Sequence, residues 1–417
     1  MMRTDMPVNK NLEIILAARE HRMQRQKALL KDYEKPLLSF TMNIAGPTKN
    51  SPLISLAFRA GIRRIQAAIG IPLHCQIIEE ESGCEALMVY DIPASELKKQ
   101  CIFLEEGTPI GRLYDLDVLD GRGEKISRPV SRKCLVCSGP VSLCARNRAH
   151  GLEAVQNATQ ILLRQFAAEY LSMMAAEALR REVHLTPKPG LVDEINSGAH
   201  HDMDLPLFEK SIVALRPWFA AFINLGLEGA SAQSLHQAGI TAEKAMFTAT
   251  DGINTHKGAL YIFALILSAI GRILAIGGTW DDVFSQAAKI ANQLPVPQGT
   301  HGSSVRTCCG GVRQEAMAGF PHARQMAKML EEESPQVVLL WSMAHTDDST
   351  LVYRGGLTGL QFVQQQAAEI LSAPEDKKGT LMQELDAELI ARHLSPGGSA
   401  DLLSLSLFLQ DARFLFS

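Results

Sequence analysis

The most constraining feature of this chain is a long stretch without glycine or proline, "LEAVQNATQILLRQFAAEYLSMMAAEALRREVHL", residues 152–185. Its apolar residues recur every three to four positions, which is the spacing along one face of an α-helix. The stretch therefore predicts one long amphipathic helix or two abutting helices. It also divides the chain, because the sequence patterns before and after it differ in kind.

The part before this stretch has a mixed pattern. Residues 12–33 carry apolar side chains at helical spacing, and Pro36 ends that pattern. Short runs rich in β-forming residues follow, separated by glycine, proline and charged turns, so we expect a small α+β domain over residues 1–165. The expected strands are residues 37–44, 74–80, 86–92, 101–106 and 113–119.

The part after it is helical in nearly every segment, and no alternating strand pattern stands out. We therefore expect a larger all-α domain over residues 166–417. Its most hydrophobic run, "ALYIFALILSAI" at residues 259–270, is too short to span a bilayer and predicts a buried core helix.

Length and composition set the remaining bounds. A chain of 417 residues is long enough for two or more hydrophobic cores, and its 46% hydrophobic and 21% charged residues are typical of a soluble globular protein. A net charge of −4 gives no whole-chain argument for a nucleic-acid or membrane partner. The N-terminus lacks the apolar segment of a signal peptide, and the eight cysteines do not form a recognisable disulfide framework, so we expect a reduced, cytoplasmic setting.

Five loops of the helical part combine glycine with lysine, arginine, histidine or aspartate. Asn254 or Thr255 is expected to cap the apolar helix that begins near His256, and Ser399 is expected to cap a second helix, with Asp401 in its first turn. The candidate residues are Lys188, Asp193, His200 and Asp202 in the first loop, Asn254, His256 and Lys257 in the second, His301 and Arg313 in the third, Asp348 and Arg354 in the fourth, and Gly397, Gly398 and Asp401 in the fifth.

Each loop taken alone has a structural explanation as a surface turn or a helix cap. Taken together, the carboxylates can share Mg²⁺, while the cations and the N–H groups at helix N-termini hold phosphates. The residues by themselves predict a site for a polyphosphate with Mg²⁺.

Five motifs carry a resemblance to a known family: "EVHLTPKPGLVDEINSGAHHDM", "GINTHKG", "THG…GGVRQEAMAGFP", "DDSTLVYRGG" and "SPGGSADLL". Together they resemble, in order over some 240 residues, the triphosphoribosyl-dephospho-CoA synthases. The resemblance implies that ATP and 3′-dephospho-CoA give 2′-(5″-triphosphoribosyl)-3′-dephospho-CoA and adenine.

The resemblance also implies roles for the candidate residues. Cations and polar groups of the loops would hold the phosphates of ATP or dephospho-CoA, and carboxylates would hold Mg²⁺ or stabilise positive charge that develops on the ribose. One carboxylate would act as the base, and His200 is a second candidate for that role. The implied catalytic residues are Asp193, His200, Asp202, Asp348 and Asp401, with Asp202 and Asp348 as magnesium ligands, and the implied binding residues are Lys188, Asn254, His256, Lys257, His301, Arg313, Arg354, Gly397 and Gly398.

The N-terminal part carries a pair of carboxylates in "LYDLDVLDGRG". Asp115 and Asp117 lie two residues apart on a predicted strand, so both side chains point to the same face, where they can bind Mg²⁺ for attack on an α-phosphate. A strand that simply runs into a turn at Asp120 and Gly121 explains the same residues equally well.

A second signal is a cluster of cysteines in a basic stretch, "SRPVSRKCLVCSGPVSLCARNRAH". Cys134, Cys137, Cys144 and His150 are the ligand types of a small zinc site, although their spacing is not that of a standard zinc finger. A zinc-containing nucleic-acid-binding module is the rival interpretation. No aromatic residue on which a base could stack occurs within residues 120–150, and the basic residues suit a charged nucleotide or an acidic carrier protein equally well.

The motifs "LAAREHRMQRQKALL", "TMNIAGPTKNSPL", "YDLDV", "ISRPVSRKCLVC" and "CARNRAH" resemble the apo-citrate lyase phosphoribosyl-dephospho-CoA transferases. The resemblance implies a nucleotidyltransferase-like domain that joins the product of the helical part to a serine of the citrate lyase acyl carrier protein, its γ subunit, and releases pyrophosphate. Asp115 and Asp117 would then bind Mg²⁺, and the triphosphate would be held by Lys49, Arg128, Arg132 and Arg146.

The two resemblances support each other, because one part makes what the other consumes. The sequence is therefore interpreted as a fused synthase and transferase, with malonate decarboxylase as the alternative destination of the same chemistry.

Overall fold

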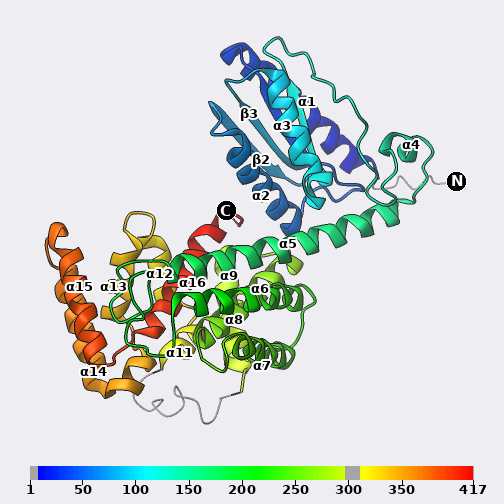
Figure 1. Cartoon of the computed structure of the whole chain (residues 1–417). Helices are drawn as coiled ribbons and strands as arrows, with labels where there is room; N and C mark the ends of the chain where they lie inside the picture. The colour runs from blue at the N-terminus through cyan, green and yellow to red at the C-terminus, as the bar shows by residue number, and fades with distance from the viewer. Residues whose placement is uncertain (1–7, 296–309, 417) are drawn as a thin grey trace. The chain divides into compact units, whose positions relative to one another are not determined.

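The computed structural model describes residues 8–295 and 310–416. These residues form two compact units that divide between Ala167 and Ala168, and the boundary falls inside one long helix, α5 (Leu152–Val183). Each unit is described by itself. The fold is mostly helical, with one small antiparallel sheet in the first unit, as the sequence predicts (Figure 1).

The first unit is built on a four-stranded antiparallel sheet of order β2-β3-β1-β4. Four of the five expected strands form. Its elements are α1 (Val8–Tyr33), β1 (Leu37–Met42), α2 (Pro52–Ile69), β2 (His74–Glu80), β3 (Gly83–Val89), α3 (Ala94–Glu106), the 3₁₀ helix η1 (Pro109–Leu113), β4 (Tyr114–Leu119) and α4 (Val141–Arg146).

The expected strand at residues 101–106 is wrong. The segment belongs to α3, in which Leu97, Cys101 and Leu104 are buried at helical spacing. The helical spacing is not visible within residues 101–106 alone, because Leu97, the first residue of the buried set, precedes that segment.

Strand β1 is buried on both faces of the sheet. Phe40 packs on Phe58 of α2, with 4.8 Å between ring centroids, whereas Leu37 belongs to a cluster with Leu29 of α1 on the opposite face. Because side chains alternate along a strand, α1 and α2 cover opposite faces. The register pairs Ser39 with Asp117 and Thr41 with Asp115, which places both aspartates on the α1 face of β4.

In the second unit every element is a helix among the described residues, in agreement with the all-α expectation. Beyond α5 the helices are α6 (Leu205–Leu227), α7 (Ala232–Ala249), α8 (Lys257–Ile276), α9 (Trp280–Gln293), α11 (Gly311–Met317), α12 (Pro321–Met329), α13 (Pro335–His345), α14 (Ser349–Leu371), α15 (Glu375–Ala391) and α16 (Gly397–Arg413).

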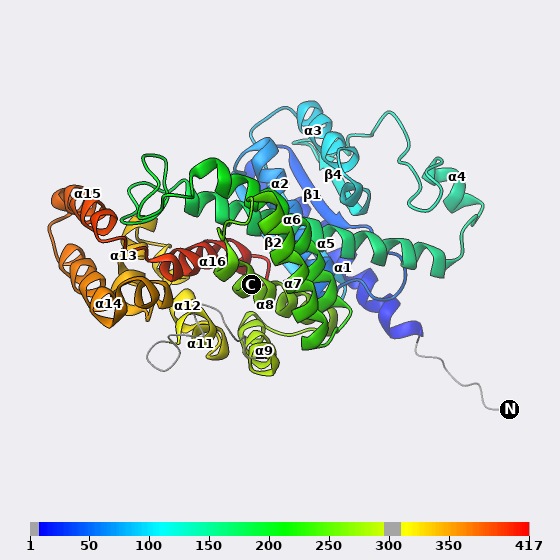
Figure 2. The same cartoon turned by 60° about the horizontal axis from the view of Figure 1, so that its bottom comes forward.

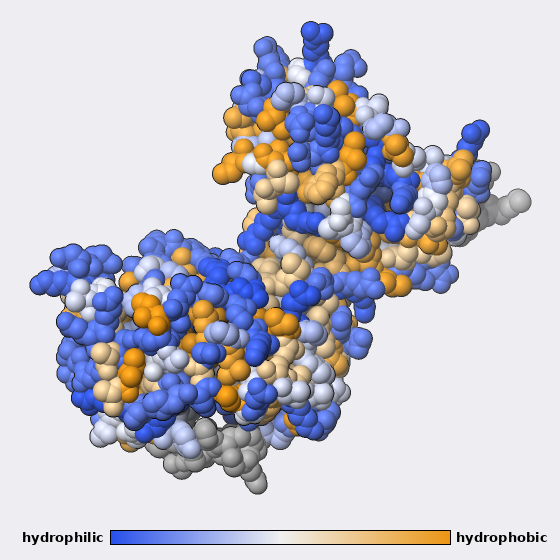
Figure 3. All heavy atoms as spheres, in the orientation of Figure 1, coloured by the Kyte–Doolittle hydropathy of each residue, from blue (hydrophilic) through white to orange (hydrophobic). Residues whose placement is uncertain are grey.

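Helix α8 is the core of this unit, in contact with α6, α7, α9 and α16 (Figure 2). It is long and apolar enough to cross a membrane by length and composition, yet 78% of that apolar window is buried inside the fold. The face seen in Figure 3 is, by contrast, mostly hydrophilic, with hydrophobic side chains in small groups. The prediction of a buried core helix is confirmed.

Two glycines let α6 and α8 approach closely. A Cβ added to Gly226 would lie 2.0 Å from the carbonyl oxygen of Ser268, and one added to Gly271 would lie 2.2 Å from that of Ile223. At these positions the backbones themselves form the contact, and any side chain would push the helices apart.

Candidate active site

A cavity of about 1100 Å³ opens in the helical unit. All five loops contribute residues to it, the third through Arg313, whereas His301 of that loop lies outside the described residues. The expected site residues that line it are Lys188, His200, Asp202, Asn254, His256, Lys257, Arg313, Arg354, Gly397, Gly398 and Asp401.

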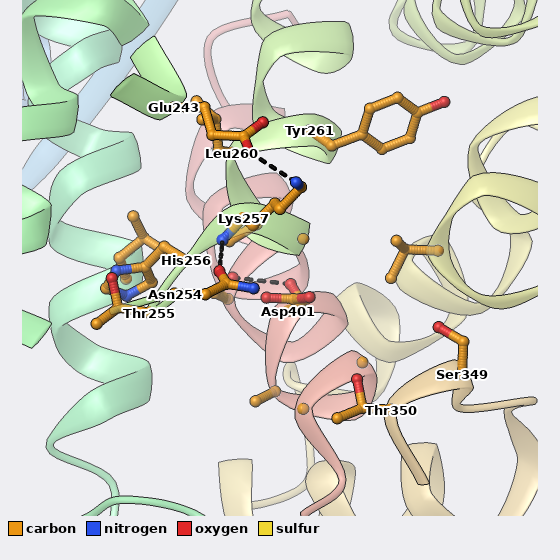
Figure 4. A pocket seen from close by; sticks show the side chains of 18 of the residues that line it. Glu243, Asn254, Thr255, His256, Lys257, Leu260, Tyr261, Ser349, Thr350 and Asp401 are labelled. Carbon is orange, nitrogen blue, oxygen red and sulfur yellow. Dashed lines mark hydrogen bonds and ion pairs between the residues drawn. The ribbon is translucent and has the colours of Figure 1, made fainter. Parts of the chain in front are cut away.

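Three helices begin at this cavity. The first residues of α8, α14 and α16 all line it: Lys257 and Gly258, Ser349 and Thr350, and Gly397 and Gly398 (Lys257, Ser349 and Thr350 are labelled in Figure 4). The dipole of a helix N-terminus attracts anions, which can also bind those N–H groups of the first turn that have no side-chain partner. Three such ends at one cavity favour a polyanionic ligand.

The caps of these helices differ in part from the expected ones. Helix α8 has His256 as its N-cap residue, and the side chain of Asn254 accepts from the N–H of Lys257 at 3.2 Å. Helix α16 begins after Pro396, so the expected Ser399 cap is wrong. The N–H of Ser399 instead donates to the carboxylate of Asp348 at 3.0 Å, because that buried acceptor replaces a local cap.

Asp348 joins two helix ends. As the N-cap of α14 it accepts from the N–H groups of Thr350 and Leu351, and at α16 it accepts from Ser399. Burial raises its pKa, while these N–H groups oppose the rise. Asp348 does not line the cavity among the described residues. Its position fixes the ends of α14 and α16 against each other.

Asp193 likewise accepts hydrogen bonds from backbone N–H groups. Its carboxylate accepts from the N–H groups of Ile195 at 2.8 Å, Asn196 at 3.0 Å and Lys188 at 3.3 Å. It is buried and does not line the cavity in the described part of the chain. It shapes the loop from which the ammonium group of Lys188 reaches the cavity.

Lys188 forms a buried ion pair that sequence reasoning missed. Its Nζ lies 2.6 Å from Glu182 of α5, and the two side chains are 2% and 5% exposed. Glu182 carries no local signal, because it is one of several acidic residues in a long helix. A phosphate that binds Lys188 therefore has to compete with, or add to, a carboxylate already in place.

His256 is buried at the cavity wall. Its Nδ1 lies 2.8 Å from Oγ of Ser211, which also accepts from Thr255, and its Nε2 has no partner among the described residues. Burial lowers its pKa to about 3. Since the Ser211 hydroxyl then donates to Nδ1, the neutral ring presents an N–H at Nε2 as an unused donor.

His200 and Arg354 form a second polar group. Nδ1 of His200 accepts from Arg354 at 3.1 Å, and Nε2 lies 2.9 Å from Oγ of Ser395. Burial and Arg354 lower the pKa of His200 to about 4. Both ring nitrogens are engaged, which leaves no free lone pair for a base. Asp202 is exposed and lines the same cavity.

The other cations also have partners. Lys257 pairs with Glu243 of α7 at 2.6 Å, a contact drawn in Figure 4. Arg313 donates to the carbonyl oxygens of Leu294 and Pro295. Glu243, like Glu182, lies in a helix that gives no hint of the cavity.

Asp401 lies against the first turn of α8. A Cβ on Gly258 would be 1.9 Å from its Oδ2, so only glycine allows this approach. The N–H of Ala259 donates to it. Burial raises its pKa well above the ordinary value, and the nearby carboxylates of Asp348 and Glu182 raise it further.

In the first unit, Asp115 and Asp117 have basic partners. Asp115 pairs with Arg132 at 3.0 Å, and Asp117 pairs with Lys125 at 2.6 Å. Arg132 also contacts the buried Glu105. Burial raises the pKa of Glu105 and the positive charge of Arg132 lowers it, and the net effect is a raised pKa.

The remaining basic candidates of this unit are placed as follows. Arg128 pairs with Glu105 and Glu106. Glu105 therefore contacts both Arg128 and Arg132, and Arg132 is the partner of Asp115. Lys49 follows β1 and donates to the carbonyl oxygen of Ile44 at 2.5 Å. Arg146 is exposed in α4.

The cysteine cluster closes into one group. The ligand atoms of Cys134, Cys137, Cys144 and His150 all lie within 4.8 Å of one another. Nε2 of His150 is buried without a partner among the described residues. Burial opposes ionisation of Cys134, but N–H groups of Cys137 and Val136 lower the pKa of its thiol to about 7, which favours a thiolate.

Two family models together cover nearly the whole chain. Residues 168–415 match the model "CitG: ATP:dephospho-CoA triphosphoribosyl transferase", and residues 10–166 match "CitX: Apo-citrate lyase phosphoribosyl-dephospho-CoA transferase".

Individual relatives show the same division. The chain is 35% identical to Protein CitXG of Haemophilus influenzae, over 97% of this chain and 96% of that protein. It is 41% identical to a 2-(5''-triphosphoribosyl)-3'-dephosphocoenzyme-A synthase of Pectobacterium atrosepticum, over 57% of this chain and 88% of that protein. A synthase of the same description from Haemophilus ducreyi is 33% identical, over 66% of this chain and 98% of that protein.

Proposed function

The chain belongs to the family of fused CitX and CitG enzymes, and from this membership we propose which residues of each unit carry its reaction. It is a bifunctional transferase of citrate lyase prosthetic-group biosynthesis. One reaction joins the triphosphoribosyl group of ATP to 3′-dephospho-CoA and releases adenine. The other transfers phosphoribosyl-dephospho-CoA to an apo acyl carrier protein and releases pyrophosphate.

The helical unit is the synthase. The single observation that supports its site is the meeting of three helix N-termini, Lys188, Lys257 and Arg354 at one cavity of about 1100 Å³. Both substrates are polyanions, and the triphosphate is retained, so it must be held and aligned and not cleaved.

The binding residues divide by position. Lys257 and the start of α8 hold one set of phosphates, and Arg313, Arg354, Gly397 and Gly398 line the remainder of the cavity. The free Nε2–H of His256 donates to an oxygen of the ligand. Lys188 pairs with Glu182, so the ammonium group of Lys188 would orient both the Glu182 carboxylate and the substrate.

In this unit, Mg²⁺ is proposed at Asp202. Of the two carboxylates suggested by the sequence, Asp202 lines the cavity, whereas the oxygens of Asp348 accept from helix N–H groups. Bound Mg²⁺ would neutralise triphosphate charge. Asp202 is also proposed to accept the proton of the attacking 2′-hydroxyl group, since it is an exposed carboxylate of the cavity wall.

The sheet-containing unit is the transferase. Asp115 and Asp117 share one face of β4, their side chains are 44% and 32% exposed, and they offer oxygen ligands for Mg²⁺. Arg128, Arg132, Lys49 and Arg146 would hold the triphosphate once the arginines exchange their carboxylate partners for phosphate oxygens. The acceptor is a serine of the citrate lyase γ subunit.

A structural zinc ion is proposed at Cys134, Cys137, Cys144 and His150. The donor set and the unpartnered Nε2 of His150 fit Zn²⁺. The ion would supply folding energy to a segment with little regular structure, the same segment that carries Arg128 and Arg132. Metal analysis of protein purified without chelators tests this, and less than one zinc per chain contradicts it.

The setting proposed for the protein is the cytoplasm, where the six cysteines that the structure describes would remain free of disulfide bonds. Malonate decarboxylase is the alternative destination, and modification of its carrier protein in preference to that of citrate lyase would favour it. A nucleic-acid-binding role for the zinc segment predicts salt-dependent binding to generic DNA or RNA.

The first experiment is chromatography of the products formed from ATP, 3′-dephospho-CoA and Mg²⁺. Free adenine is expected without free phosphate, because the triphosphate stays on the ribose. Formation of ADP or AMP with phosphate would contradict the assignment of the helical unit.

A further inference from the structure

Four carboxyl groups line the cavity among the described residues, and two of them have a lysine partner. Glu182 pairs with Lys188, and Glu243 pairs with Lys257. Asp202 is exposed to water. In residues 8–295 and 310–416, Asp401 is the cavity carboxyl that is partly buried and has no cation in ion-pair distance.

The surroundings of Asp401 favour its neutral form. The charged groups that face it are Glu182 of α5 and Asp348 at the start of α14, and both are acidic. From α8 it receives the N–H of Ala259, which favours the carboxylate but does not outweigh burial and the two negative charges. Burial therefore raises the pKa of Asp401 well above its usual range, which favours a carboxylic acid at the cavity wall, beside Gly258.

We propose that Asp401 is the general acid that protonates the departing adenine. The proposal rests on the synthase function of this unit. The C1′–N9 bond of ATP breaks with its electron pair on the base, and the Asp401 proton moves to a ring nitrogen, so that neutral adenine leaves. A bond forms between C1′ and the 2′-oxygen of dephospho-CoA, whose proton passes to Asp202 and then to solvent. Asp401 regains a proton from solvent after adenine has left.

The geometry supports this step over a role in phosphate binding. A carboxyl group held against Gly258 offers no positive charge to a phosphate. Protonation of a poor leaving group is the task for which an acid of raised pKa is suited at neutral pH. The apolar residues Phe208, Leu260 and Tyr261, which also line the cavity, provide a surface for a purine ring.

The test compares ATP with 7-methyl-ATP, whose base already carries a positive charge and leaves as neutral 7-methyladenine without an acid. Asp401→Asn is expected to lower kcat for adenine release from ATP about 10²- to 10⁴-fold. With 7-methyl-ATP its kcat, corrected for spontaneous release, is expected to stay within about threefold of the unchanged enzyme. Asp411→Asn, at the exposed end of the same helix, is the matched control and is expected to change neither rate.

Equal losses with both substrates would show a structural role for Asp401 and overturn the proposal, as would full activity of the variant with ATP. The pH profile of the unchanged enzyme gives a second readout that needs no folded variant. Its rate with ATP is expected to fall as pH rises through the pKa of Asp401, and this fall is expected to be absent with 7-methyl-ATP. If the unchanged enzyme releases no adenine from ATP, the proposed function fails instead.

Discussion

At the scale of single residues, the cavity depends on charges that are buried together. Lys188 and Glu182 are each almost fully buried, and each is tolerated because the other is present. Asp193 and Asp348 are tolerated because backbone N–H groups surround their oxygens. The sequence reveals such acidic residues near turns but not their partners, so it assigns capping aspartates and cavity aspartates to the same role.

Lys188→Met tests the buried pair. The substitution leaves Glu182 charged and uncompensated, so the free energy of unfolding is expected to fall by about 3–5 kcal/mol. Urea unfolding measures the change. The double variant Glu182→Met/Lys188→Met is expected to recover most of it, and Lys35→Met, which breaks an exposed pair with Asp91, is expected to cost under about 1 kcal/mol. Similar losses in the single and double variants would contradict the pairing.

His256 makes stability depend on pH in a defined direction. Its pKa is about 3 in the folded protein and 6.5 when exposed, so the unfolded chain gains a proton first as pH falls. Its contribution to stability is present above pH 6.5 and is lost as pH falls towards 3, by up to about 1.4 kcal/mol per pH unit. His256→Gln is expected to reduce this slope in urea unfolding at pH 7.5, 6 and 5. An unchanged slope would show that the ring is accessible to protons in the fold.

At the scale of elements, periodicity predicted most of the fold because most elements bury one continuous face. Helix α5 and strands β1, β2 and β4 appear at the expected positions. The segment 101–106 was wrongly predicted as a strand because its six residues are rich in β-forming types. The helical spacing of its buried side chains is recognisable only when Leu97 is included. Helix starts were harder to place, since α16 depends on a carboxylate 51 residues earlier in the chain.

The close crossing of α6 and α8 was beyond sequence reasoning and can be tested directly. Gly226→Ala places a methyl group 2.0 Å from the carbonyl oxygen of Ser268 on the partner helix. The helices must separate, so we expect a loss of about 1–3 kcal/mol in unfolding free energy. Gly379→Ala, at an exposed position of α15 with nothing within 4 Å of the added Cβ, is expected to stabilise by about 0.5–1 kcal/mol. A gain in both variants would contradict the close packing of α6 on α8.

At the scale of the whole molecule, two activities share one chain because the product of one reaction is the substrate of the other. The motifs of both units were recognisable in the sequence since they lie in continuous loops. The partners Glu182 and Glu243 were not recognisable, since they come from helices distant in sequence from those loops. Relatives such as the Pectobacterium atrosepticum synthase, which aligns with 57% of this chain over 88% of its own length, show that the synthase unit also occurs without a fused transferase.

Two single-site variants of the full chain test whether the units work independently. Asp202→Asn is expected to abolish adenine release, and Asp117→Asn is expected to spare it and to stop modification of the carrier protein. Neither variant alone then converts ATP, dephospho-CoA and apo carrier into holo carrier.

An equimolar mixture of the two variants is expected to restore the reaction after a lag, because the charged, soluble intermediate made by the Asp117→Asn chain reaches the intact transferase of the other chain through solution. Mass spectrometry of the carrier measures the modification. Asp411→Asn serves as the control that retains both activities. If the mixture stays inactive while each variant keeps its remaining partial activity, the intermediate does not leave the chain that makes it, and fusion of the units is then required for the overall reaction.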